Sequence, residues 1–173
     1  MYGPYLTMAP SAMTTLMAHF ENTHTTPDDY DLILTGDLGK LGSEILMDLM
    51  ENKGVKLGSN YGDCGQMMFT DEQRTFQGGS GAGCSASVLT SYVLKKLESG
   101  EFKKVLFAPT GALLSPLSSQ QGDSVPGICH AFTLLSPKYE SPKRSTTKKV
   151  QKNMDSNSND ISKAKTMKLV KGD

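Results

Sequence analysis

The stretch that decides this fold is Phe76-Gln77-Gly78-Gly79-Ser80-Gly81-Ala82-Gly83-Cys84-Ser85-Ala86, which places four glycines in eleven residues and runs directly into an apolar helical pattern. Glycine allows a backbone to adopt positive φ and lets a second chain or a ligand approach it closely. The first N–H groups of a helix also point outward, toward an anion or a carbonyl. Two interpretations stay open: the small residues allow a crowded helix to pack on a sheet, or the loop binds a ligand.

Helical and strand patterns alternate on both sides of this stretch. Helices are predicted from Ser11, from Ser43 to Lys53, and from the glycine stretch to Gly100, on apolar residues spaced three and four apart. Strands are predicted at residues 30–36, 104–108 and 128–135, with short turns at 26–29 and 110–112 and an irregular segment at 55–77. This order of elements predicts an α/β fold with a layered sheet.

The distribution of charge divides the chain into two parts. Net charge is zero, but residues 1–137 carry 8 Lys and Arg against 14 Asp and Glu, whereas residues 138–173 carry 10 against 4. The first part is long enough for one domain with its own core. The second is rich in Ser, Thr, Asn and Lys, and is predicted to be a disordered basic tail. Its dispersed lysines favour a solvated appendage over a polybasic arm for nucleic acid or an anionic membrane, so we expect no nucleic-acid partner.

The cysteines Cys64, Cys84 and Cys129 are too irregularly spaced for a disulfide framework or a zinc site. The sequence shows no secretory signal and no apolar run long enough to cross a bilayer, so we expect a chain in a reducing cytosol without a transmembrane segment. Cys84 has the best position for a nucleophile, since a helix N-terminus lowers the pKa of a thiol. A small buried residue among glycines is nevertheless the favoured interpretation of Cys84.

No convincing catalytic set accompanies these thiols. His19 and His24 flank the exposed end of the first predicted helix, and His130 lies in an apolar strand as a core histidine would. Asp63, Asp71 and Glu72 lack the spacing of a metal site, and we expect no metal and no cofactor. Asp63-Cys64, between two glycines, reads either as an exposed polar handle on a loop or as a solvated loop acid.

A set of specific motifs runs from about residue 3 to residue 135. They are Gly3-Pro4, Asp29-Tyr30-Asp31-Leu32-Ile33, Thr35-Gly36-Asp37-Leu38-Gly39-Lys40, Asp63-Cys64-Gly65, Asp71-Glu72-Gln73, Gly78-Gly79-Ser80-Gly81, Val105-Leu106-Phe107-Ala108-Pro109-Thr110-Gly111 and Thr110-Gly111-Ala112-Leu113-Leu114-Ser115-Pro116. In these motifs the chain resembles the stage V sporulation protein AD family of the thiolase-like superfamily. The resemblance implies a fold of two related α/β halves, of which residues 1–137 supply most of the C-terminal one.

The resemblance also bears on catalysis, because its superfamily includes acyltransferases. The nucleophilic cysteine of thiolases and type III ketoacyl synthases lies in the other half. Gly36 stands where their Asn or His would act, and the second catalytic position falls at Gln77 to Gly79, again without a usable base. We therefore expect no catalytic residues and no thiolase-type carbon–carbon chemistry, and an acyltransferase remains the alternative function.

What the family implies instead is binding of dipicolinic acid, its uptake into the forespore and its release on germination. The implied partners are membrane proteins of the same sporulation operon, at the cytoplasmic face of the forespore inner membrane. A planar dianion suits backbone N–H groups at a helix start. The expected ligand-binding residues are Gly79, Ser80 and Gly81 in the pocket, with Asp63 and Cys64 on its rim.

A third interpretation is a truncated reading frame without independent activity, because the sequence begins just before its first predicted helix. A sheet without the family's opening strand, and without the N-terminal half that packs on it, would expose an edge and apolar surface. We therefore expect poor solubility or self-association, which a sharp monomeric profile in size-exclusion chromatography would contradict.

Overall fold

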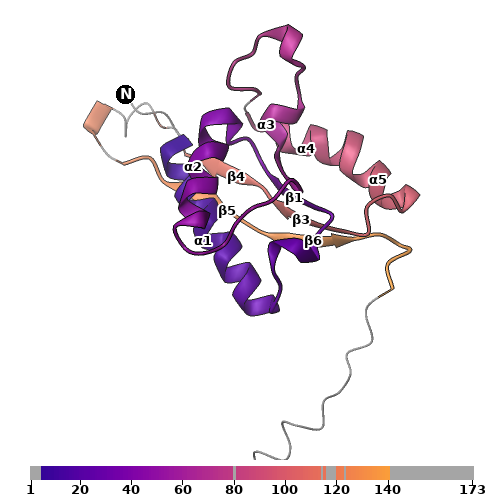
Figure 1. Cartoon of the computed structure of the whole chain (residues 1–173). Coiled ribbons are helices and arrows are strands. Elements are labelled where there is room, and N and C mark those ends of the chain that lie inside the picture. Colours follow the sequence, from indigo (N-terminus) through magenta and orange to yellow (C-terminus); the bar gives the residue numbers. More distant parts are fainter. Residues whose placement is uncertain (1–4, 80, 114, 116–119, 123, 141–173) are drawn as a thin grey trace, which may run out of the picture. The chain divides into compact units, whose positions relative to one another are not determined.

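A computed structural model describes residues 5–79, 81–113, 115, 120–122 and 124–140 (Figure 1). The predicted tail, residues 138–173, lies outside the described residues except for its first three. The helices are α1 (Tyr5–Thr23), η1 (Pro27–Asp29), α2 (Gly39–Glu51), α3 (Cys64–Met67), η2 (Asp71–Gln73), α4 (Cys84–Val88), the π-helical turn η3 (Leu89–Val93) and α5 (Leu94–Ser99). The strands are β1 (Leu32–Thr35), β2 (Tyr61–Asp63), β3 (Lys104–Ala108), β4 (Thr110–Ala112), β5 (Gly127–Cys129) and β6 (Phe132–Leu135).

The described strands form two sheets. The larger has the order β2-β1-β3-β6, in which β1 runs parallel to both β2 and β3, and β6 runs antiparallel to β3. The smaller is the antiparallel pair β4-β5. Helices α1 and α2 lie on one side of the larger sheet, and the α4-η3-α5 helix lies on the other (Figure 1). This confirms the predicted α/β class.

Side-chain alternation along the strands explains why both faces of the sheet are covered. Ile33 and Leu106 are buried in a cluster with residues of α1 and α2. Their neighbours Leu34, Val105 and Phe107 are buried in a second cluster, with residues of α3, α4, η3 and α5. A strand buried on both faces reads as a continuous apolar run, which is the pattern that predicted β1 and β3.

Two helices begin earlier than predicted. Helix α1 begins at Tyr5 rather than Ser11, so Pro10 lies within it; the Pro10 carbonyl accepts a hydrogen bond from Thr14 Oγ1 at 2.9 Å. Helix α2 begins at Gly39 rather than Ser43. Proline and glycine are poor helix formers, but here tertiary packing outweighs their low helix propensity. The predicted stop at Gly100 is confirmed, since this residue caps α5 with φ +82°.

The predicted strand at 128–135 is wrong as a single element. It divides into β5 and β6, because β5 pairs with β4 whereas β6 pairs with β3. The predicted turn at 110–112 is the strand β4. His130 lies between β5 and β6 and is exposed, so it is not a core histidine. The short turn predicted near Pro27 is confirmed as η1.

Among the residues that the structure describes, no helix combines the length and the apolarity that crossing a bilayer requires.

Candidate functional site

Three parallel strands end side by side at one edge of the larger sheet. In the pairing register, Thr35 at the end of β1 lies opposite Asp63 of β2 on one side and Ala108 of β3 on the other. The segments that follow these strands, residues 36–37, 64–65 and 109–110, therefore meet, and we call them the carboxyl edge. In open α/β sheets, ligands bind in the crevice outside the carboxyl ends of the strands.

Asp63 joins the segments of this edge through a buried carboxylate. Its Oδ2 atom accepts hydrogen bonds from Thr35 Oγ1 at 2.7 Å and from the Leu38 N–H at 2.9 Å. Its Oδ1 atom accepts from the Gly39 N–H at 2.9 Å and from the Gly65 N–H at 3.0 Å. Only 1% of Asp63 is exposed, so both oxygens are occupied inside the protein. The carboxylate holds the starts of α2 and α3 together.

The polar network extends from Asp63 to Tyr61. The Tyr61 hydroxyl lies 3.0 Å from Thr35 Oγ1, which donates to Asp63. Burial raises the pKa of Tyr61 to about 12, so this hydroxyl remains protonated at neutral pH. Burial also raises the pKa of Asp63, and the hydrogen bonds from Thr35 and from the backbone oppose that shift.

The glycine stretch packs onto the carboxyl edge through backbone contacts that exclude side chains. The Gly79 N–H donates to the Gly65 carbonyl at 2.7 Å. A Cβ on Gly78 would lie 2.3 Å from that same carbonyl oxygen, and a Cβ on Gly65 would lie 2.5 Å from the Gly79 oxygen. A Cβ on Gly36 would lie 2.6 Å from the Thr110 nitrogen. These approaches require glycine.

Farther along the stretch, the backbone is open. The Gly81 N–H donates to Asp37 Oδ2 at 3.1 Å, and Thr110 Oγ1 donates to Asp37 Oδ1 at 3.2 Å. Gly81 has φ +116°, and a Cβ on Gly81 or on Gly83 would meet no heavy atom within 4 Å. The stretch thus divides into a packed part at 78–79 and an open part that includes Gly81 and Gly83.

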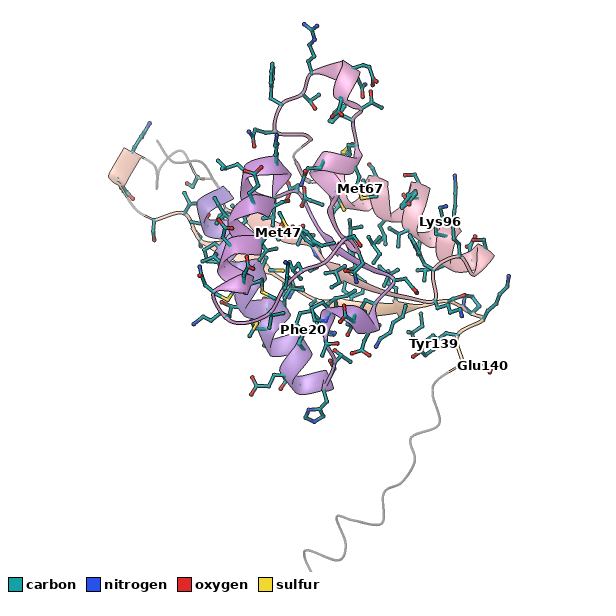
Figure 2. The ribbon with its side chains drawn as sticks, in the orientation of Figure 1. Phe20, Met47, Met67, Lys96, Tyr139 and Glu140 are labelled. Carbon is teal, nitrogen blue, oxygen red and sulfur yellow. The ribbon has the colours of Figure 1, made fainter. Side chains whose placement is uncertain are left out.

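Two hollows flank the start of α2 beside this edge. The first, which we call the Lys40 hollow, has a volume of about 380 Å³. It is lined by Lys40, Gln66, Phe69, Thr70, Asp71, Arg74, Thr75, Phe76, Gln77 and Gly78. The second, of about 360 Å³, shares Lys40 and Gln66 with the first and is also lined by Met47 and Met67, which are labelled in Figure 2.

Comparison with known proteins places the chain in a family. The family model described as stage V sporulation protein AD (SpoVAD) matches residues 5–135. The chain belongs to this family. Stage V sporulation protein AD of Bacillus subtilis (strain 168) is 46% identical over 123 residues, which cover 71% of this chain and 36% of that protein. The chain thus spans about a third of the length of this relative, and the resemblance read from the motifs is confirmed at the level of the family.

The ligand-binding residues expected from the SpoVAD resemblance do not all lie at the surface. Gly79 is half-buried and Gly81 is exposed at the carboxyl edge, whereas Ser80 lies outside the described residues. Asp63 and Cys64 are buried, with 1% and 0% exposure. The expectation of an exposed handle on a loop is therefore wrong, because Asp63 turns inward to cap the backbone N–H groups of α2 and α3. A ligand-binding role for the five residues stays a prediction.

The three cysteine thiols of the chain are buried. Burial raises the pKa of Cys84 to about 11, and burial and the carboxylates of Asp63 and Asp37 raise the pKa of Cys64. The idea of a helix N-terminus that lowers the Cys84 pKa is wrong here, because burial, together with the nearby carboxylates of Asp37 and Asp63, raises that pKa. The favoured interpretation of Cys84 as a buried residue among glycines is confirmed, with 3% exposure.

The remaining titratable candidates of the sequence do not converge. Asp71 and Glu72 lie exposed on η2, and His24 is exposed at the end of α1. His19 is half-buried, with Nε2 2.8 Å from the Tyr30 hydroxyl. In the part of the chain that the structure describes, no three His, Cys, Asp or Glu side chains gather as a metal site would require.

Sequence reasoning missed three groups at this edge: Thr35, Asp37 and Lys40. A signal for Thr35 was available, because a threonine at the end of an apolar strand places a polar hydroxyl in a buried layer, where it needs a hydrogen-bond partner. Asp37 and Lys40 belong to one of the motifs that carry the family resemblance, but the sequence predicted no role for either side chain.

Proposed function

We propose that this chain is a sporulation protein that binds dipicolinic acid and supports its uptake into the forespore and its release on germination. The observation that carries the proposal is a glycine stretch packed on the carboxyl ends of three parallel strands in a member of the SpoVAD family. Such an edge is where open α/β sheets bind ligands. The sporulation role follows from the name of the relative, and the ligand follows from the resemblance.

We place the proposed site at Gly79, Ser80 and Gly81. Asp63 and Cys64 would act beneath it as a buried support rather than as contacts. Asp63 is suited to that role, because it accepts hydrogen bonds from the backbone N–H groups of Leu38, Gly39 and Gly65 and so holds them in place. A preorganised wall binds more tightly than one that must order itself on binding.

The wider assignments are part of the same proposal. We propose that residues 1–137 form a thiolase-like C-terminal half, which acts with an N-terminal half of the same kind. Its place would be the cytoplasmic face of the forespore inner membrane, beside membrane proteins of the same operon. The length of the Bacillus subtilis relative supports a further partner half, since this chain spans 36% of that protein.

An acyltransferase is less well supported by these residues. Cys84 and Cys129 are buried, with pKa values raised to about 11, and a thiol that stays protonated at neutral pH is a poor nucleophile. Incubation with acyl-CoA followed by mass spectrometry tests this alternative. A covalent acyl group on any cysteine would favour the acyltransferase.

Calorimetric titration of the full 173-residue chain with dipicolinate tests the proposed function. We expect saturable binding that is weakened in Gly79→Val and Ser80→Val and is unchanged in the control Ser59→Val, an exposed position that lines neither hollow. A Cβ on Gly79 would meet the flexible ends of Phe69 and Met68 at 2.9 and 3.0 Å, so this variant alters the wall without a backbone clash. Absence of saturable binding by the unmodified chain would contradict the function. Unchanged affinity in both loop variants would contradict the placement of the site.

A further inference from the structure

Asp37 places a second carboxylate at the carboxyl edge, in direct contact with the glycine stretch. We propose that Asp37 is a specificity-determining residue, whose carboxylate opposes negative charge on the ligand, so that the edge selects ligands by their charge. The inference rests on the proposed function, and it deepens that function by naming the residue that limits the affinity for a dianion.

The position of Asp37 is fixed by its neighbours. Its N–H donates to Thr110 Oγ1 at 3.3 Å, and the same hydroxyl donates to Asp37 Oδ1 at 3.2 Å. A Cβ on Gly36 would lie 2.9 Å from that hydroxyl oxygen, and a Cβ on Gly65 would lie 3.5 Å from Asp37 Cα. Asp37 is therefore held between the start of β4 and α3, and Thr110 orients its carboxylate.

The other carboxylate oxygen of Asp37 occupies a donor of the loop at which we place the ligand. The Gly81 N–H donates to Asp37 Oδ2 at 3.1 Å, although a Cβ on Gly81 would meet no heavy atom within 4 Å. A backbone N–H at such an open position is a donor that an anionic ligand can use. A ligand carboxylate at Gly81 must therefore displace Asp37 or bind beside it, and in both cases two negative charges lie close together.

A thiol of the same stretch already responds to this charge. Cys84 begins α4, shortly after Gly81 in the chain, and its side chain is buried. Burial raises the pKa of Cys84 to about 11, and the carboxylates of Asp37 and Asp63 contribute to that shift. Asp37 thus disfavours a negative charge on Cys84, and the same field acts on a ligand carboxylate at Gly81.

The repulsion grows with the charge of the ligand, because the Coulomb energy is proportional to that charge. Dipicolinate is a dianion, whereas picolinate has the same ring with one carboxylate fewer, so Asp37 lowers the affinity for dipicolinate more. Asparagine has nearly the shape of aspartate without its charge, so Asp37→Asn should remove the repulsion. We expect this variant to bind dipicolinate about tenfold more tightly and picolinate about threefold more tightly.

The experiment is calorimetric titration of the full 173-residue chain with dipicolinate and with picolinate, in the unmodified form and in three variants. Asp37→Asn removes the charge, Thr110→Val removes the hydroxyl that orients the carboxylate but keeps the charge, and Asp48→Asn removes a charge from the exposed side of α2. We expect the ratio of the affinity for dipicolinate to that for picolinate to rise about threefold in Asp37→Asn and to stay unchanged in the other two. Because a loosened loop would change both affinities alike, this ratio separates lost charge from lost structure.

The outcomes separate the inference from the function on which it rests. If the unmodified chain does not bind dipicolinate, both fail. If it binds dipicolinate and Asp37→Asn leaves the affinity ratio unchanged or lowers it, the inference fails and the proposed function stands. A rise of the same size in Asp48→Asn would also overturn the inference, because the effect would then come from the total charge of the chain.

Discussion

At the residue scale, one carboxylate connects elements that are distant in the sequence. Asp63 ends β2, yet its oxygens accept from Thr35 at the end of β1 and from the N–H groups that open α2 and α3. A buried carboxylate is costly unless it is fully hydrogen-bonded, and here each oxygen has two donors. The geometry of the carboxyl edge therefore depends on this side chain.

Replacement of this carboxylate should destabilise the fold. In Asp63→Asn, an amide N–H₂ takes the place of one oxygen and faces donors instead of accepting from them. We expect a loss of about 2–3 kcal/mol in the free energy of unfolding, the cost of buried donors left without an acceptor. Urea denaturation measures it, with Asp48→Asn on the exposed side of α2 as the control. Equal stability of the two variants would show that Asp63 does not hold the edge together.

The buried thiols predict a dependence of stability on pH. Burial raises the pKa of Cys84 and of Cys129 to about 11, whereas an unfolded thiol ionises near about 8.5. Above that value the unfolded chain releases protons that the native chain keeps, so the free energy of unfolding falls as pH rises. We expect a loss of about 2 kcal/mol per thiol between pH 8 and pH 10, measured by urea denaturation at each pH. In Cys84→Ala the slope should be smaller, and an identical slope would argue against a raised pKa at Cys84.

At the element scale, the glycine stretch combines packing with an open surface. Gly78 and Gly79 lie against the backbone or side chains of the α3 region, whereas Gly81 and Gly83 have open space where a Cβ would lie. The two interpretations that the sequence left open therefore both apply to this stretch. Packing explains the contacts of Gly78 and Gly79, and ligand binding at Gly79, Ser80 and Gly81 stays a prediction.

Substitutions within this one stretch should therefore differ sharply. In Gly78→Ala, the new Cβ would lie 2.3 Å from the Gly65 oxygen at a residue with φ +96°, and we expect a loss of at least about 2 kcal/mol. In Gly83→Ala, no atom lies within 4 Å of the new Cβ and φ is −94°, so we expect a change within about 0.5 kcal/mol. Thermal unfolding compares the two. If Gly78→Ala were as stable as the unmodified chain, the close contact of the stretch with α3 would be contradicted.

The longer helices and the strands β1 and β3 were predictable from local pattern, but the prediction of an irregular segment at 55–77 is wrong, because β2, α3 and η2 lie there. The apolar runs of β1 and β3 and the stop at Gly100 follow from period and turn chemistry, which are local properties. The early start of α2 was not predictable, because Gly39 is required by its contact with Gln77, a partner distant in sequence. For the same reason the division of residues 128–135 into β5 and β6 depends on which strand each half pairs with.

At the scale of the whole molecule, the motif resemblance identified the family but did not predict the chemistry of the carboxyl edge. The sequence placed Gly79 and Gly81 near a site, yet it read Asp63 as exposed, since burial depends on the strands that pack around it. Large apolar side chains such as Met67, Met68, Phe69 and Phe76 remain exposed on the described chain. Self-association through such a surface stays a prediction, for which size-exclusion chromatography is the test.

The central claim is that dipicolinate binds at the carboxyl edge of the sheet. It is tested most directly by titration of the ¹⁵N-labelled full chain with dipicolinate, followed through its backbone amide resonances. We predict saturable shifts at Lys40, Gly65 and Gly79 and little change at the opposite end of the sheet, near Asp31 and Lys104. Shifts confined to that opposite end, or no saturable shift at all, would contradict the claim.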